Sequence, residues 1–192
     1  MTIDDCQLSI DHPRRGAQDG ERHSVDSAVY ISLGSNIGDR EATLRRALKL
    51  LDCRPGLRVT AVSSMIETRP VGGPAGQSYY LNAAAKIETE LGPLELLEAL
   101  QEVEAICGRN RATEQRWGPR TCDLDILLMG DKVMDSPELT IPHPWMHQRL
   151  FVLRPLAEIA PQAVHPVLHK TVAQLLADLG EQHRAEAEGG TK

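Results

Sequence analysis

Hydrophobic positions along the chain form short segments that switch between two periods. Alternating or continuous apolar residues over about four to eight positions are typical of strands, and apolar residues three or four positions apart are typical of helices. Strands are predicted over residues 29–33, 57–66, 79–88 and 122–129, with a short strand and a loop over residues 130–145. Helices are predicted over residues 39–51, 93–107, 151–159 and 172–179.

The predicted order, β-α-β-β-α-β and then two helices, is the split βαβ pattern of ferredoxin-like folds. The fold class is therefore expected to be α+β, with an antiparallel sheet, helices packed on it and extra C-terminal helices. Residues 1–27 are polar and lack a sustained period, which predicts a disordered leader. Residues 181–192 are rich in Glu, Ala and Gly and predict a disordered tail. The remaining residues, 28–180, have the length of one domain.

Composition narrows the class of protein. The net charge of −6 argues against a general nucleic-acid binder, which needs a basic surface. No apolar run approaches the length of a membrane span, and the N-terminus lacks a signal-peptide pattern. The four cysteines have no zinc-type spacing and are expected to be reduced thiols in a cytoplasmic protein. Nothing in the sequence resembles a dimer seam, so we expect a monomer.

The segment Arg116-Trp-Gly-Pro-Arg-Thr-Cys-Asp-Leu-Asp-Ile-Leu-Leu128 is the most informative part of the sequence. Asp123 and Asp125 are two positions apart on a predicted strand, so their side chains should point to the same face. An Asp-x-Asp pair on a strand is usually a solvated edge, and a run of arginines is usually a solvated loop. Here the acids directly follow Arg116 and Arg120, and a metal-bound polyphosphate would satisfy both groups.

Several motifs in order resemble the 6-hydroxymethyl-7,8-dihydropterin pyrophosphokinase family of folate synthesis. The resemblance covers about residues 28–180. Besides the acid-bearing segment, it rests on five stretches: Tyr30-Ile-Ser-Leu-Gly-Ser-Asn-Ile-Gly-Asp39, Glu67-Thr-Arg-Pro-Val-Gly72, Tyr80-Leu-Asn-Ala-Ala84, Ile141-Pro-His-Pro144 and Phe151-Val-Leu-Arg-Pro-Leu-Ala-Glu-Ile-Ala-Pro161.

The resemblance implies transfer of pyrophosphate from ATP to the hydroxymethyl group of the pterin, giving AMP and the pterin diphosphate. It implies that Asp123 and Asp125 hold two Mg²⁺ ions and that Arg109 and Arg120 act with them as catalytic residues. The implied ATP-binding residues are Gln101, Glu104, Arg109, Arg120, Ile126, Thr140, His143 and Arg149. The implied pterin-binding residues are Gly34, Thr68, Pro70, Val71, Tyr80, Asn82, Trp117 and Phe151. The substrates are thus expected to be small molecules, without a nucleic-acid or membrane partner.

Three positions depart from the family pattern: Trp145 and Ala112 where related sequences carry basic residues, and Gln115 as a one-residue insertion. These departures are expected to affect the affinity for ATP and the closure of the loop over the nucleotide. The alternatives are a catalytically inactive paralogue and a non-catalytic ferredoxin-like binding module. A nucleotidyltransferase is disfavoured, because Gly34-Ser35 and Asp123 are too far apart in the sequence for its single βα unit. Without the resemblance, Tyr80 and Phe151 would be interpreted as core residues and His143 as a turn residue.

Overall fold

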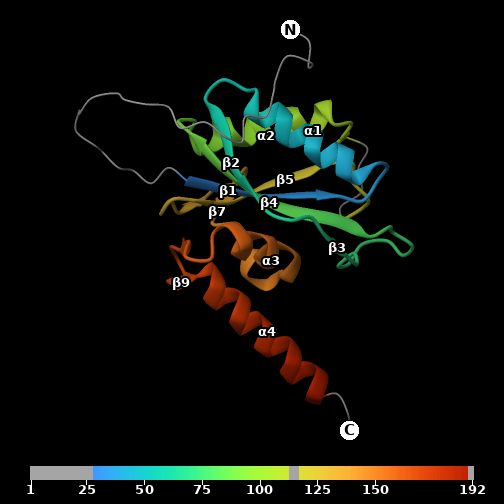
Figure 1. Ribbon diagram of the computed structural model, residues 1–192, viewed down its shortest axis with the longest axis vertical. Helices are drawn as coiled ribbons and strands as arrows, with labels where there is room; N and C mark the ends of the chain where they lie inside the picture. Colours follow the sequence, from blue (N-terminus) through green and yellow to red (C-terminus); the bar gives the residue numbers. More distant parts are fainter. Residues whose placement is uncertain (1–27, 113–116, 190–192) are drawn as a thin grey trace, which may run out of the picture.

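A five-stranded antiparallel sheet forms the centre of the computed structural model, which describes residues 28–112 and 117–189 (Figure 1). Its strands are β1 (Ala28–Ser35), β2 (Leu57–Val62), β3 (Ile66–Thr68), β4 (Tyr80–Thr89) and β5 (Asp123–Met129). The order across the sheet is β2-β4-β1-β5, and β3 pairs with β4. This order of antiparallel neighbours confirms the predicted ferredoxin-like core. The expected disordered leader, residues 1–27, lies outside the described residues.

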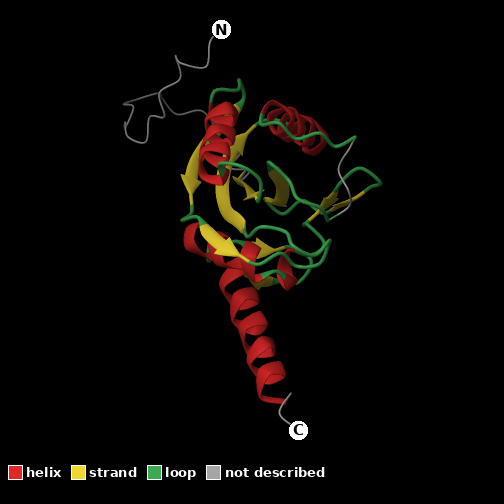
Figure 2. Cartoon of the chain, turned by 90° about the vertical axis from the view of Figure 1, so that its right-hand side faces the viewer, coloured by secondary structure: helices red, strands yellow, loops and turns green. Residues whose placement is uncertain are grey.

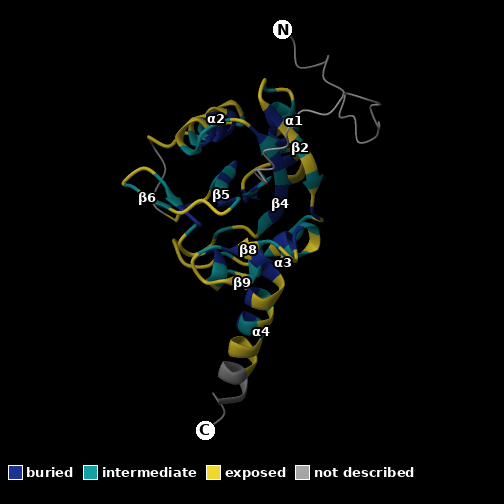
Figure 3. Ribbon diagram, turned by 90° about the vertical axis from the view of Figure 1, so that its left-hand side faces the viewer, coloured by how far each residue is buried: buried dark blue, intermediate teal, exposed yellow. Residues whose placement is uncertain are grey.

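Helices cover both faces of the sheet (Figures 1 and 2). Helices α1 (Arg40–Asp52) and α2 (Pro93–Ile106) pack on one face, and α3 (Leu150–Ile159) packs on the other. Helix α4 (Val172–Gly189) starts against α3 and extends away from the sheet, so that residues 181–184 are exposed (Figure 3). A 3₁₀ turn and two small hairpins complete the fold: η2 (Met146–Gln148), β6 (Met134–Asp135) with β7 (Thr140–Ile141), and β8 (Val164–His165) with β9 (Lys170–Thr171).

The alternation along β1 explains why the sheet has two cores. Val29, Ile31 and Leu33 are buried beneath α1 and α2, whereas Tyr30 packs into the cluster around α3. A sheet covered on both faces does not present exposed aromatics to RNA, which disfavours the ferredoxin-like binding module.

The predicted strand over residues 57–66 is two strands. Ser63 is buried and its Oγ accepts the Ala84 N–H at 2.9 Å, while the Ser64 N–H and Oγ both donate to Glu158 on α3, at 2.9 and 2.6 Å. These side-chain bonds replace the ladder bonds at this point, so β2 ends and β3 begins as a separate short strand.

The C-terminal helix is longer than predicted. We expected it to end near Leu179 and residues 181–192 to be loose, whereas α4 continues to Gly189. The added segment is rich in Glu and Ala, which favour helix, and this propensity outweighs the absence of an apolar period.

The expectation of four reduced thiols is wrong at one position. Cys107 and Cys122 are free, and Cys122 is buried in the core as its strand parity predicts. Cys53, an exposed residue at the C-terminal end of α1, is disulfide-bonded. Among residues 28–112 and 117–189, no helix combines the length and the apolar character needed to cross a membrane.

Candidate active site

A cavity of about 410 Å³ opens beside the ends of β1, β4 and β5. All eight residues predicted to bind the pterin line it, together with Asp123, Asp125, Arg120, His143 and Arg149. The fold therefore brings the acid pair, the arginines and the aromatic side chains, which come from distant parts of the sequence, to a single cavity.

Asp123 and Asp125 lie at the start of β5, where they pair with Gly34 and Ser32 of β1. Both side chains face the cavity, as the alternation predicted, and Leu124 and Ile126 are buried in the core below. Burial, with the nearby charges of Asp123 and Glu104, raises the pKa of Asp125 to about 7. Two carboxylates this close hold a shared negative charge that a divalent cation would neutralise.

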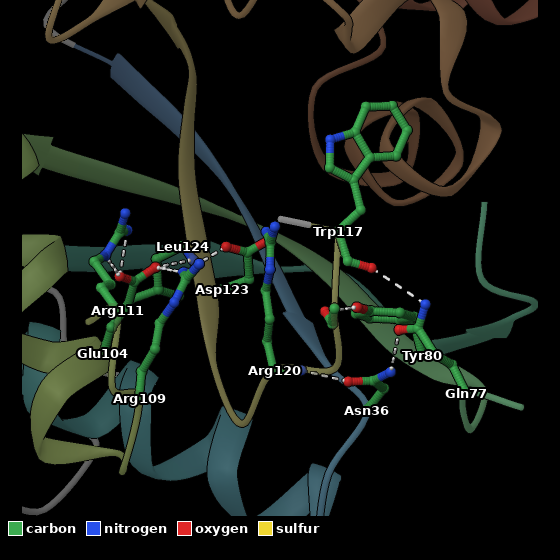
Figure 4. A network of polar contacts seen from close by, with 11 residues as sticks. Asn36, Gln77, Tyr80, Glu104, Arg109, Arg111, Trp117, Arg120, Asp123 and Leu124 are labelled. Carbon is green, nitrogen blue, oxygen red and sulfur yellow. Dashed lines mark hydrogen bonds and ion pairs between the residues drawn. The ribbon is translucent and has the colours of Figure 1, made fainter. Parts of the chain in front are cut away.

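Two arginines contact the Asp123 carboxylate from opposite sides (Figure 4). Arg109 Nη1 donates to Oδ1 at 2.5 Å, and Arg120 Nη1 donates to Oδ2 at 2.7 Å. The Arg120 Nε is buried and has no hydrogen-bond partner among the described residues. A buried donor without a partner is costly, so a phosphate oxygen in the cavity would fit this position.

Glu104 anchors the arginines from the end of α2. Its side chain is only 1% exposed and accepts hydrogen bonds from Arg109 at 2.5 Å, from Arg111 at 2.5 Å and from the Leu124 N–H at 2.8 Å. Burial raises its pKa, while the Leu124 hydrogen bond and the two arginines oppose that shift. Glu104 does not line the cavity, and its direct role in ATP binding stays a prediction.

His143 is placed to act as a neutral donor. Burial, with the charge of Arg149, lowers its pKa to about 4. Its Nδ1 accepts the Trp145 N–H at 3.1 Å, which leaves the proton on Nε2. Arg149 lies with its guanidinium carbon 5.7 Å from the centre of the Phe151 ring, so a residue predicted to bind ATP and a residue predicted to bind the pterin are in contact here.

The opposite wall of the cavity carries aromatic and amide groups. Asn82 Nδ2 donates to Thr68 Oγ1 at 2.8 Å, and the Tyr80 hydroxyl donates to the Gly118 carbonyl at 3.1 Å. A Cβ at Gly34 would lie 3.4 Å from Asn82 Oδ1, so glycine leaves room beside this amide. These groups suit a flat heterocycle that stacks on rings and presents donors and acceptors at its edge.

Asn36 and Gln77 join the two loops that border the cavity, and sequence reasoning missed both. Asn36 Oδ1 accepts the Arg120 N–H at 2.7 Å, and its Nδ2 donates to Gln77 Oε1 at 3.3 Å (Figure 4). Gln77 Nε2 in turn donates to the Trp117 carbonyl at 3.2 Å. The Asn36-Ile-Gly38 turn after β1 and the Gly-rich loop gave no signal that these amides pair, because the partners are far apart in the sequence.

A glycine substitution tests whether this loop contact matters. In Gly73→Ala the new Cβ would lie 2.2 Å from the Trp117 carbonyl oxygen and 2.6 Å from Gln77 Nε2, so we expect separated loops and weaker substrate binding by about tenfold or more. Gly76→Ala is the matched control, since it has a similar φ of +81° but no atom within 4 Å of its Cβ. The measurement is pterin affinity; equal losses in both variants would reduce the effect to backbone strain.

Five of the eight predicted ATP-binding residues do not line the cavity: Glu104 and Arg109, described above, and Gln101, Ile126 and Thr140. Gln101 is on α2, Thr140 is on β7, and the Ile126 side chain is in the main core. Their roles rest on the resemblance alone. Lining residues that were not predicted, besides Gln77, are Ser32, Leu33, Arg69, Gly72, Leu127, Trp145, Gln148 and Val152. Trp145 had been marked only as a departure from the family pattern.

Comparison with known proteins agrees with this geometry. Residues 30–161 match the family described as 7,8-dihydro-6-hydroxymethylpterin-pyrophosphokinase, or HPPK. The chain belongs to this family. It is 52% identical over 138 residues to 2-amino-4-hydroxy-6-hydroxymethyldihydropteridine pyrophosphokinase of Bacillus subtilis, covering 72% of this chain and 81% of that protein. It is 46% identical over 133 residues to the Pseudomonas aeruginosa protein of the same name, covering 69% and 80%.

Solved structures support the HPPK fold. The wild-type HPPK-DHPS of Plasmodium falciparum with pteroate superposes with a TM-score of 0.65 at 15% identity, over 84% of this chain. The present chain spans only 44% of the length of that protein, so this likeness concerns the fold. Every residue that lines the cavity lies within the part of the chain that matches the HPPK family.

Proposed function

We propose that the chain transfers the terminal diphosphate of ATP to the hydroxymethyl group of 6-hydroxymethyl-7,8-dihydropterin. The products would be AMP and the pterin diphosphate. One observation carries this proposal: the Asp123–Asp125 pair and the cationic residues share a single cavity with the ring-binding wall of Tyr80, Asn82 and Phe151. An ATP-dependent diphosphotransferase needs both halves within reach of each other.

The residues fit Mg²⁺. Mg²⁺ is held in proteins by one or two carboxylates, with the remaining ligands from substrate phosphates and water. Asp123 and Asp125 supply those carboxylates, and no group of three or more metal-ligating side chains occurs in the described part of the chain. We therefore infer that two ions enter with ATP and that both are held by this pair. When bound, they would neutralise charge on the phosphate oxygens around the reacting β-phosphorus.

The neighbouring side chains would then bind the phosphate oxygens. Arg120, Arg149 and the neutral His143 would donate hydrogen bonds to phosphate oxygens, and Arg109 would join them during transfer. The pterin hydroxyl oxygen would attack the β-phosphorus and release its proton to solvent, the bond from that phosphorus to the oxygen shared with the α-phosphate would break, and AMP would leave with that oxygen. No covalent intermediate on the protein is needed, so positioning and charge stabilisation account for the rate.

The pterin would lie between the aromatic side chains on the other wall. Tyr80 and Phe151 supply flat faces, Asn82 reads donors and acceptors at the ring edge, and Trp117 with the residue 68–72 loop covers the opening. Since all of these groups come from one chain, we propose that the protein works as a monomer. We also place it in the cytoplasm, where ATP is supplied, without a nucleic-acid or membrane partner.

Product analysis tests the proposal. The protein is mixed with Mg²⁺, ATP and 6-hydroxymethyl-7,8-dihydropterin, and nucleotides and pterins are separated. AMP that appears in step with a pyrophosphorylated pterin supports diphosphate transfer. ADP would mean transfer of a single phosphate, and no turnover by a folded sample would favour the inactive paralogue.

A further inference from the structure

Both carboxylate oxygens of Asp123 are already taken by arginines in the free protein. Oδ1 accepts from Arg109 and Oδ2 accepts from Arg120, at 2.5 and 2.7 Å (Figure 4). Asp123 is the same group that would hold Mg²⁺, and a metal ligand oxygen facing a guanidinium is poorly placed to accept a second cation.

The Arg109 contact differs from a surface salt bridge. The Arg109 side chain is 5% exposed and that of Glu104 is 1% exposed, so solvent does little to screen their charges. Arg111, by contrast, is 51% exposed and contacts Glu104 without contacting Asp123. The two loop arginines therefore share one anchor but only Arg109 reaches the metal ligand.

We propose that Arg109 stands in for a metal ion on Asp123 in the free protein, and that Glu104 is the positioning residue that holds it there. The inference rests on the proposed function, since it concerns the same two carboxylates. Arg109 leaves Asp123 when the phosphates of a nucleotide offer it a better partner. Divalent metal and nucleotide therefore bind together, and the metal alone binds weakly.

The geometry of Glu104 makes this exchange feasible. When Arg109 leaves, Glu104 still accepts from the Leu124 N–H and from Arg111, at 2.8 and 2.5 Å. The buried carboxylate keeps these partners, so it is not left uncompensated after the exchange. The Leu124 hydrogen bond also keeps the start of β5 in place while Arg109 changes partners.

Mn²⁺ binding to the full-length protein, followed by electron paramagnetic resonance, tests the exchange. Without nucleotide, Arg109→Met should bind Mn²⁺ more tightly than wild type, on the order of tenfold. Arg111→Met is the matched control: it removes a loop arginine from the same anchor and should change the affinity little. With a non-hydrolysable ATP analogue, the difference between Arg109→Met and wild type should shrink, because the phosphates now hold Arg109.

The role of Glu104 has a separate readout. Glu104→Gln keeps an acceptor for the Leu124 N–H but weakens the hold on Arg109. The ratio of Mn²⁺ affinities with and without the ATP analogue should fall in Glu104→Gln, and the substitution should not change this ratio further in an Arg109→Met background. Removing the charge of Glu104 affects the Mn²⁺ affinity both with and without the ATP analogue, so this effect largely cancels in the ratio. If Glu104 had only a structural role, the ratio would be unchanged.

Two results would overturn the inference: unchanged Mn²⁺ affinity in Arg109→Met, or an equal rise in Arg111→Met. Mn²⁺ binding needs no turnover, so it can be measured whatever the product analysis gives. A protein that makes no AMP but shows the expected Mn²⁺ pattern would contradict the proposed function and keep the arginine exchange. An active protein without that pattern would support the proposed function and contradict the arginine exchange.

Discussion

Asp125→Asn is expected to lower diphosphate transfer on the order of 10³-fold and to make the free protein more stable than wild type at pH 8. The loss of activity follows from the loss of a charged oxygen ligand for Mg²⁺. The gain in stability follows from the pKa of Asp125, which is raised from 3.8 to about 7 by desolvation of the half-buried carboxylate and by the charges of Asp123 and Glu104. Asparagine has nearly the same shape and carries no charge.

The pH dependence of this stability difference has a defined sign. Between pH 4 and 7 the unfolded chain has lost the Asp125 proton while the folded protein still holds it, so unfolding releases a proton and wild-type stability falls as pH rises. The variant does not titrate here. Its advantage should therefore grow from pH 4 to 7 and level off above that, as measured by urea unfolding at several pH values. A stability difference between the variant and wild type that stays constant from pH 4 to 7 would contradict the raised pKa of Asp125.

Asp123→Ala should distinguish the role of Asp123 in the free protein from that of Asp125. It should also abolish transfer, but it should lower stability, because Arg109 and Arg120 would both lose a carboxylate partner at 2.5 and 2.7 Å. If Asp123→Ala were instead as stabilising as Asp125→Asn, the two acids would be equivalent in the free protein and the arginine contacts would have little energetic weight.

Arg120→Ala is expected to lower kcat/KM for ATP by about 10²- to 10³-fold while the affinity for the pterin changes little. The Arg120 guanidinium contacts Asp123 and leaves its buried Nε available for a phosphate oxygen. Its backbone N–H bond to Asn36 is retained in the variant, so the loop should stay in place. Steady-state kinetics with varied ATP and direct pterin titration measure the two effects.

Arg69→Ala serves as the control for Arg120→Ala. Arg69 is also an arginine on the cavity, but it is exposed and its Nε donates to the Tyr79 hydroxyl at 3.2 Å. Its removal should have little effect on ATP use. A loss of pterin affinity in Arg120→Ala with ATP use retained would place Arg120 in the other half of the cavity.

The parts of the site that follow strand alternation were predictable from the sequence. Asp123 and Asp125 share a face because β5 has a period of two, and the same rule placed Cys122 in the core. The ferredoxin-like order followed from the change of apolar period between segments. These features depend on local geometry, and local geometry is encoded in nearby residues.

Features that depend on side-chain pairing across distant segments were not predictable. The break between β2 and β3 requires Glu158, which lies on α3 far along the chain. The link from Asn36 through Gln77 to the Trp117 backbone joins three loops. Likewise, Arg109 had been predicted as an ATP ligand, and nothing local to it indicated that it would bridge Glu104 and Asp123 in the free protein.

Both tryptophans of the chain, Trp117 and Trp145, line the cavity, and they are 49% and 54% exposed. No other residue contributes indole emission, so the tryptophan fluorescence of the protein, excited selectively over its three tyrosines, comes from two side chains that line the cavity. A pterin that packs against Trp117 should quench it, and a nucleotide near His143 should perturb Trp145. The order in which two unlabelled substrates arrive can thus be followed in a stopped-flow fluorimeter, with Trp117→Phe and Trp145→Phe assigning each signal to one indole.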